Sequence, residues 1–203
     1  MQHVMASTPF SDSALRHFAA LVESTREDES IPLAAAALAI ARMEYPDLDA
    51  DPYLARLEEM AQQVRTRLRK SPTARESIAL LNQVLFQEEG LRGNREDFYD
   101  PRNSFLNDVL DRKLGIPITL SVVYMEVAGR VGFPVAGVGM PGHFLLKHYD
   151  VGAGEIFIDA FNRGSILARK IVNSVWMKSM AGRLTCERST CSRLRIARYW
   201  AAC

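Results

Sequence analysis

The sequence of 203 residues lacks several features that would point to familiar functions. No apolar run approaches the ~18 residues that a membrane-spanning helix needs; the longest run, residues 31–41, is shorter and rich in alanine. No glycine-rich loop opens a helix, which argues against a phosphate-cradling nucleotide site. The first residues have no basic start followed by an apolar stretch, so we expect a cytoplasmic protein that does not enter a membrane.

Cysteine is scarce and unevenly placed. The three cysteines, Cys186, Cys191 and Cys203, all lie near the C-terminal end, so the first 185 residues contain no thiol. In a cytoplasmic protein we expect these thiols to be free. Cys186 and Cys191 lack two further ligands nearby, which argues against zinc. We therefore expect no metal and no cofactor.

The net charge is only +1, but the charges are unevenly distributed. Residues 1–164 contain 17 basic and 23 acidic side chains, whereas residues 165–203 contain eight basic and one acidic. A basic segment is a candidate nucleic-acid surface, but the acidic body lacks the interleaved aromatic and basic residues of single-strand binders. We expect no nucleic-acid partner and interpret 165–203 as a divergent basic tail, disordered or read in a shifted frame.

Residues 1–100 are predicted to form a helical N-terminal region. Apolar residues recur at helical spacing in four segments: 11–24, 31–45, the stretch that begins at Asp51 and Pro52, and 73–89. Asp51 followed by Pro52 is typical of a helix start, and Gly90 is typical of a helix end. This region is expected to pack on the segment that follows it.

Residues 101–164 are predicted to form an α+β core. Ser104 is expected to cap a helix that ends near Leu114, and a second helix is expected over 117–131. After this helix the apolar period changes to two, which predicts three antiparallel strands at 135–140, 143–148 and 155–159. A hairpin symmetric about Val151 would join the last two strands, pairing Lys147 with Glu155, Leu145 with Phe157 and His143 with Asp159.

A histidine beside a carboxylate is a common catalytic arrangement, because the carboxylate fixes the imidazole tautomer and raises its basicity. Such a pair needs a nucleophile, best placed at a helix N-terminus. The helix that starts at Pro117 offers only the hydroxyls of Thr119 and Ser121. Either hydroxyl is the nucleophile, or Thr119 caps the helix and Ser121 packs within it. Metal binding by His143, Asp159 and His148 is weaker, because His148 would point to the other face of the strand.

Two motifs, YDPRNSFLNDVLDRKLGIPITLSVVYMEVAGRVGFPVAGVGMPGHFLL and FIDAFNRG, are similar to those of the transglutaminase-like superfamily. More narrowly, residues 12–164 resemble the bacterial invasion-regulator Sir B family, whose domain also occurs in a eukaryotic F-box protein. The resemblance implies a papain-like core in which a nucleophile-bearing helix packs on an antiparallel sheet. It also implies that His143 and Asp159 are the family histidine and aspartate. The family cysteine would fall at or near Pro117, which cannot be a nucleophile.

Two functions from different classes remain open. The missing thiol favours a non-catalytic, regulatory module that binds a protein or peptide in a cleft beside the 117–131 helix. Asn103, Pro117 and Tyr124 would line this cleft next to His143 and Asp159. The retained His–Asp pair supports the alternative, a hydrolase or acyl-transferase that uses a Ser or Thr hydroxyl. Family members commonly carry helical repeats after the core, a position that the basic tail takes here.

Overall fold

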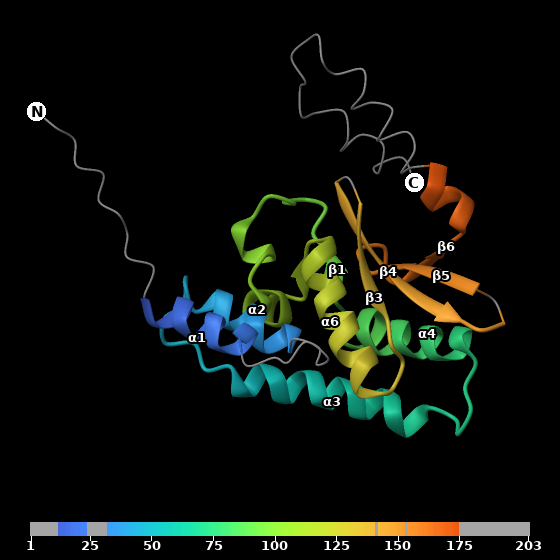
Figure 1. Cartoon of the computed structure of the whole chain (residues 1–203), viewed down its shortest axis with the longest axis horizontal. Coiled ribbons are helices and arrows are strands. Elements are labelled where there is room, and N and C mark those ends of the chain that lie inside the picture. Colours follow the sequence, from blue (N-terminus) through green and yellow to red (C-terminus); the bar gives the residue numbers. More distant parts are fainter. Residues whose placement is uncertain (1–11, 24–31, 141, 153, 175–203) are drawn as a thin grey trace, which may run out of the picture.

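The computed structural model describes residues 12–23, 32–140, 142–152 and 154–174 (Figure 1). Its helices are α1 (Asp12–Glu23), α2 (Leu33–Ala41), α3 (Asp51–Arg67), α4 (Ala74–Asn82), α5 (Leu106–Arg112) and α6 (Pro117–Arg130), with a π-helix at Gln83–Glu88 and a 3-10 helix at Pro101–Asn103. Its strands are β1 (Arg92–Gly93), β2 (Leu114–Gly115), β3 (Ala136–Met140), β4 (His143–Asp150), β5 (Gly154–Asp159) and β6 (Ser165–Leu167). The fold is therefore α+β, with an antiparallel sheet as predicted.

Helix α6 lies at the centre of the molecule. In Figure 1 the four-stranded sheet is on its right, α1 and α2 are on its left, and α3 runs beneath it. The side chains of α6 that repeat at helical spacing are fully buried, and they share one apolar cluster with the helices and the sheet. This cluster includes Leu57, Leu81, Leu120, Val123, Tyr124, Val127, Leu146, Ile156 and Ile158. The N-terminal helical region thus packs on the sheet-bearing part through a common core.

The sheet contains four antiparallel strands in the order β3-β4-β5-β6, one more than the sequence predicted. The fourth strand, β6, pairs with β5 and lies in the segment that we had interpreted as a tail beginning at residue 165. Gly164 has a φ of 71°, a left-handed conformation that allows the chain to reverse after Asp159. Val172 is also buried, in a second apolar cluster on the sheet. The predicted tail from 175 onward, with its three cysteines, lies outside the described residues.

The predicted register of the β4–β5 hairpin is wrong by one residue at its centre. Asp150 pairs with Gly154 and Lys147 pairs with Phe157, so the hairpin is symmetric about residue 152. The Asp150 Oδ1 atom accepts a hydrogen bond of 2.8 Å from the Gly152 backbone N–H, which closes a tighter loop than the one expected. The shift moves each partner by two positions and therefore keeps every side chain on its predicted face.

Several predicted helix ends are also wrong. Helix α2 ends at Ala41 instead of continuing to residue 45, and α4 changes at Asn82 into a π-helix. Ser104 does not cap α5, because Asp100 accepts a hydrogen bond from the Arg102 backbone N–H and a 3-10 helix forms first. Sequence reasoning also missed the short parallel pair of β1 and β2, which fixes the loop after the π-helix beside the start of α6.

Candidate functional site

His143 and Asp159 lie together in the folded chain. The His143 Nε2 atom is 2.9 Å from the Asp159 Oδ2 atom, and only 5% and 1% of the two side chains are exposed. Extending the β4–β5 ladder by one pair sets Leu145 opposite Asp159, so His143 reaches the carboxylate diagonally. The predicted contact therefore exists, although its predicted place in the ladder was wrong.

Asn162 completes the surroundings of the Asp159 carboxylate. Its backbone N–H donates to Asp159 Oδ1 over 3.1 Å, and its side-chain Nδ2 donates to Oδ2 over 2.7 Å. Burial of Asp159 opposes its ionisation, but the hydrogen bond and charge interaction with His143 and the two bonds from Asn162 outweigh it. The pKa of Asp159 is consequently below its ordinary value. The carboxylate remains ionised in neutral solution and can orient the imidazole ring.

The Thr119 hydroxyl has a structural role at the start of α6. It accepts a hydrogen bond from the Ile116 backbone N–H over 3.1 Å, and it lies 2.8 Å from the Asn103 carbonyl oxygen, to which it donates. Every partner of this hydroxyl is a backbone atom of Asn103 or Ile116. Thr119 therefore caps the helix and is not hydrogen-bonded to His143 in this arrangement.

Ser121 is fully buried within α6. Within the described part of the chain its Oγ atom has no hydrogen-bond partner. A serine hydroxyl is a weak nucleophile until a base accepts its proton, so a catalytic Ser121 would have to approach His143. The structure thus brings together the predicted His–Asp pair but joins neither predicted hydroxyl to it.

Asn103 lies inside the molecule. It is 0% exposed, and its Nδ2 atom donates to the backbone carbonyls of Asp97 and Phe98 over 2.8 and 3.3 Å. Its Oδ1 atom accepts a hydrogen bond of 3.1 Å from Asn94 Nδ2. These bonds hold the loop before α5 in shape, so Asn103 organises this loop from within and does not present its amide to a surface cleft.

Pro117 and Tyr124 are buried as well. The Tyr124 ring is fully buried against Phe86, with ring centroids 6.2 Å apart, and its hydroxyl has no partner in the described structure. Burial raises the pKa of this phenol well above its ordinary value. The expected cleft is therefore not lined by Asn103, Pro117 or Tyr124, because the helical spacing that suggested a cleft directs these residues into the core.

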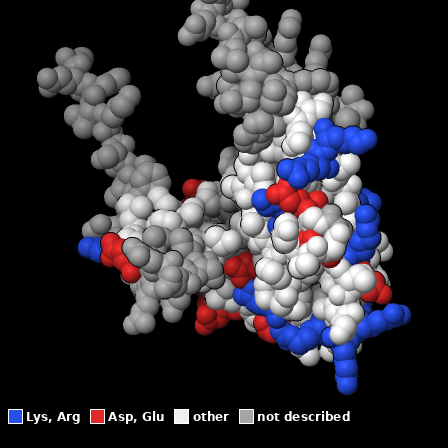
Figure 2. Space-filling view, turned by 45° about the vertical axis from the view of Figure 1, so that its right-hand side comes forward, with Lys and Arg blue, Asp and Glu red and all other residues white. Residues whose placement is uncertain are grey.

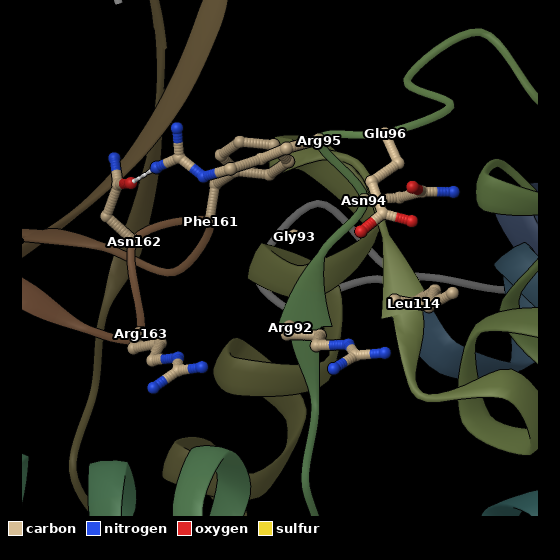
Figure 3. Close-up of a pocket in the computed structure, with 9 residues that line it drawn as sticks. All are labelled: Arg92, Gly93, Asn94, Arg95, Glu96, Leu114, Phe161, Asn162 and Arg163. Carbon is tan, nitrogen blue, oxygen red and sulfur yellow. Dashed lines mark hydrogen bonds between the residues drawn. The ribbon is translucent and has the colours of Figure 1, made fainter. Parts of the chain in front are cut away.

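A cavity of about 420 Å³ does border the His–Asp pair, and sequence reasoning missed it. It is lined by Arg92, Gly93, Asn94, Arg95, Glu96, Leu114, Phe161, Asn162 and Arg163 (Figure 3). The Phe161 ring meets the His143 ring edge-on at 6.1 Å between centroids. Two short segments far apart in sequence, GNRE and FNRG, form most of the lining. The second begins two residues after Asp159, and this proximity was the available signal.

The two segments fit closely at Gly93 and Phe161. A Cβ atom on Gly93 would lie 2.5 Å from the Phe161 ring, so only glycine allows β1 to approach this ring. The Arg95 guanidinium covers the same ring at 5.4 Å and donates a hydrogen bond to Asn162 Oδ1. Arg163 adopts a left-handed conformation with a φ of 55°. The wall of the cavity is thus held by packing and by polar contacts that lead to Asp159.

A second hollow lies between the end of α3 and the β4–β5 hairpin, with a volume of about 740 Å³. Figure 2 shows Lys and Arg side chains along the lower margin of one face, with acidic side chains beside them. Two arginines of this hollow have carboxylate partners, since Arg65 pairs with Glu58 and Arg69 pairs with Glu76. Their charges are already compensated, in contrast to those at the first cavity.

No group of three or more His, Cys, Asp and Glu side chains within the described ranges is arranged to hold a metal ion. His148, considered above as a ligand, instead places its Nδ1 atom 2.8 Å from the Pro134 carbonyl and stacks on Phe133. No helix in the part of the chain that the structure describes is long and apolar enough to cross a membrane.

A family model described as the transglutaminase-like superfamily matches residues 51–197, which is most of the chain. The chain belongs to this superfamily. The match extends beyond residue 164, the predicted end of the core, as does strand β6. Membership agrees with the α+β fold.

Curated relatives of this superfamily member include bacterial and animal proteins. A UPF0162 protein of Xylella fastidiosa (strain Temecula1) is 44% identical over 141 residues, covering 70% of this chain and 50% of the relative. A UPF0162 protein of Vibrio cholerae is 34% identical over 101 residues, covering 50% and 37%. F-box only protein 21 of Mus musculus is 38% identical over 97 residues, covering 44% and 16%.

The chain spans about half the length of the Xylella relative and a smaller share of the other two. The relatives therefore contain long regions that the match does not cover. No solved structure matches the chain.

Proposed function

We propose that the chain is a transglutaminase-like module that binds a protein or peptide and plays a regulatory role without catalysing acyl transfer. The observation that supports the proposal is that neither the Thr119 nor the Ser121 hydroxyl is hydrogen-bonded to His143 in the described structure. The Thr119 hydroxyl is hydrogen-bonded to backbone atoms at the start of α6, and the Ser121 hydroxyl is buried without a hydrogen-bond partner in the described structure. Nucleophilic catalysis needs the hydroxyl within hydrogen-bond reach of its base.

As part of this proposal we assign the chain to the invasion-regulator Sir B branch of the superfamily and place it in the cytoplasm. The branch assignment rests on the motifs that surround Pro117, His143 and Asp159. The match to F-box only protein 21 supports it, because the resemblance implied that the domain also occurs in an F-box protein. The name UPF0162 states no activity, so the function proposed here rests on the geometry of the site.

The retained pair has a structural use in such a module. Asp159 accepts hydrogen bonds from Asn162 at the end of β5, where the chain turns towards β6. The Asn162 bonds and the 2.9 Å contact between His143 and Asp159 join β4, β5 and the turn that follows. His143 and Asp159 then fix the conformation of this turn, and with it the position of the residues of the turn that line the neighbouring cavity.

One observation favours the alternative, a hydrolase or acyl-transferase. The Ser121 Oγ atom is buried and unpaired, and an unsatisfied group of this kind in a native structure calls for an explanation. A shift of α6 relative to β4 that joined Ser121 to His143 would provide one. The hydroxyl would then be the nucleophile and His143 its base.

Turnover measurements separate the two functions. The wild type, His143→Ala and Ser121→Ala are incubated with peptide, simple amide and isopeptide substrates at equal concentrations. We expect the three proteins to give the same rates as buffer alone, because no hydroxyl is activated. Turnover by the wild type that both substitutions abolish would establish the enzyme and overturn the proposal.

A further inference from the structure

The arginines around the first cavity differ from most others in the described structure. Most described arginines pair with carboxylates, as in Arg56–Asp111, Arg65–Glu58, Arg67–Glu88, Arg69–Glu76, Arg102–Asp100, Arg112–Asp100, Arg130–Glu126 and Arg169–Glu155. Arg92, Arg95 and Arg163 have no carboxylate partner among the described residues, and all three line this cavity. Glu96 is the one acidic residue in the lining. The cavity therefore concentrates uncompensated positive charge within an otherwise acidic body.

The three arginines come from two segments whose backbones are fixed. Arg92 lies on β1, which pairs with β2, and Arg95 follows it in the same loop. Arg163 lies in the turn between β5 and β6 with a φ of 55°, a conformation that is uncommon for residues other than glycine. A backbone outlier of this kind at a cavity is a reason to look for function. In Figure 3 the Arg163 side chain extends from this turn towards Arg92.

Arg95 is connected to the His–Asp pair through a single amide. Asn162 donates from Nδ2 to Asp159, and its Oδ1 atom accepts the hydrogen bond from Arg95 that is dashed in Figure 3. The Phe161 ring lies beneath the Arg95 guanidinium and also meets the His143 ring edge-on. The orientation of Arg95 therefore depends on the same carboxylate that holds His143.

We propose that this cavity binds the carboxylate group of an acidic peptide through Arg92, Arg95 and Arg163, and that the His143–Asp159 pair positions Arg95 through Asn162. The inference rests on the proposed function, to which it adds the class of ligand. A guanidinium group presents a planar set of donors that matches a carboxylate in bidentate geometry. In an active relative a carboxylate at the position of Asp159 would orient a histidine base, whereas here it orients a binding residue, Arg95.

The lining favours a carboxylate carried on a side chain over a free inorganic anion. Phe161 and Leu114 give the cavity apolar surface beside the arginines. An aliphatic stem that carries an acidic group can contact this surface, whereas phosphate gains nothing from it. Both ligands share the oxyanion that arginine recognises, so the experiment includes each of them.

The test is a titration of the full chain labelled with ¹⁵N. The probes are a peptide with capped ends that contains four glutamates between glycines, the matching glutamine peptide, and inorganic phosphate. The readouts are the affinity and the Nε–Hε resonances of the arginine side chains. We expect the glutamate peptide alone to shift the resonances of Arg92, Arg95 and Arg163, with an affinity that falls as salt is added.

Two substitutions compare the cavity with the remaining surface. Arg163→Gln should weaken the glutamate peptide by about tenfold or more, the loss expected for a charge-assisted hydrogen bond. Arg75→Gln is the matched control, because Arg75 is an exposed arginine on α4 that also lacks a carboxylate partner but lies outside the cavity lining. Its affinity for the peptide should equal that of the wild type.

The outcomes distinguish the inference from the proposed function. If the glutamate and glutamine peptides bound equally well and Arg163→Gln had no effect, the inferred carboxylate site would be wrong, although the protein would still bind peptides. Binding of phosphate without binding of the glutamate peptide would contradict the inference that the ligand is an acidic peptide. Binding of none of the probes would contradict it as well. Failure of the proposed function is detected separately, by substrate turnover that depends on His143.

The positioning role of the pair has its own test. Asp159→Asn and Asn162→Ala are made singly and together, and the affinity for the glutamate peptide is measured in each. Because both substitutions interrupt one chain of hydrogen bonds, their effects should be non-additive, and Asp159→Asn should already shift the Arg95 resonance without ligand. If that variant does not fold, His143→Gln provides the same comparison. Additive effects with an unchanged Arg95 resonance would overturn the positioning role.

Discussion

His143 and Asp159 form a buried contact of 2.9 Å although they are not opposite each other in the β4–β5 ladder. The diagonal geometry explains why a register error of one residue at the hairpin centre left the contact intact. A shift of that size moves each partner by two positions, and residues two positions apart share a face. The sequence therefore predicts the sheet face on which a side chain lies more reliably than it predicts the residue opposite it on the neighbouring strand.

The buried Ser121 hydroxyl should lower the free energy of unfolding of the protein. Replacing Ser121 with Ala removes a buried oxygen that has no partner, so the free energy of unfolding should be unchanged or higher by about 1 kcal/mol. Tyr124→Phe should behave in the same way for the same reason. Urea unfolding measures both. A loss of more than about 1 kcal/mol in either variant would mean that the hydroxyl has a partner in solution.

The Thr119 hydroxyl should contribute to the stability of α6. Thr119→Val keeps the shape of the side chain but removes the acceptor for the Ile116 N–H and the donor to the Asn103 carbonyl. We expect a loss of about 1 kcal/mol in the free energy of unfolding, the usual cost of a lost N-terminal cap. Thr119→Ser is the control and should retain most of the stability. Equal stability of the Val variant and the wild type would contradict the capping role.

The stability contributed by Asp159 should depend on pH. Its pKa is lower in the folded state, so between the two pKa values the unfolded chain binds more protons than the folded chain. The contribution is present above the unfolded value of about 3.9 and is lost as the pH falls through the folded value. The gap in unfolding free energy between the wild type and Asp159→Asn should therefore narrow below about pH 4.

Urea unfolding at a series of pH values checks this prediction. A gap that stays constant from neutral pH down to about pH 3 would show that the Asp159 carboxylate has the same pKa in the folded and unfolded chains.

Gly164 should tolerate no side chain. Its φ of 71° disfavours other residues, and a Cβ atom there would overlap Asn82 Oδ1, whose amide also bonds the Gly164 carbonyl. Gly164→Ala should lower the free energy of unfolding by about 2 kcal/mol or more. Gly129→Ala in α6 is the matched control, because a Cβ there meets nothing within 4 Å and helix propensity should add roughly 0.5 kcal/mol. Similar effects of the two substitutions on the melting temperature would contradict the account.

Much of the fold follows from local patterns in the sequence. Helical spacing located α1 to α6, and the apolar period of two located β3, β4 and β5. The hairpin register was missed because the hydrogen bond from the Gly152 backbone N–H to the Asp150 side chain decides the loop length, and apolar alternation carries no information about that bond. Strand β6 was missed because it has only three residues and begins where the charge of the sequence changes abruptly, so this segment was interpreted as part of a tail.

The site was predicted only in part for a related reason. His143 and Asp159 could be paired from the sequence because both lie on strands that one hairpin joins. Tyr124 was expected in a cleft, but a residue at the apolar spacing of a central helix is buried by its neighbours. The first cavity depends on the close approach of Gly93 and Phe161. These residues are far apart in the sequence, and no apolar periodicity predicts that they meet.

The proposed function depends above all on His143 activating neither the Ser121 nor the Thr119 hydroxyl. The most direct measurement is intact-mass analysis of the folded protein after incubation with a fluorophosphonate, which phosphonylates a serine or threonine hydroxyl, with loss of fluoride, only when a base activates it. We predict that incubation leaves the mass of the wild type and of His143→Ala unchanged, with no adduct on Ser121 or Thr119. A single adduct on either residue in the wild type that is absent from His143→Ala would contradict the account.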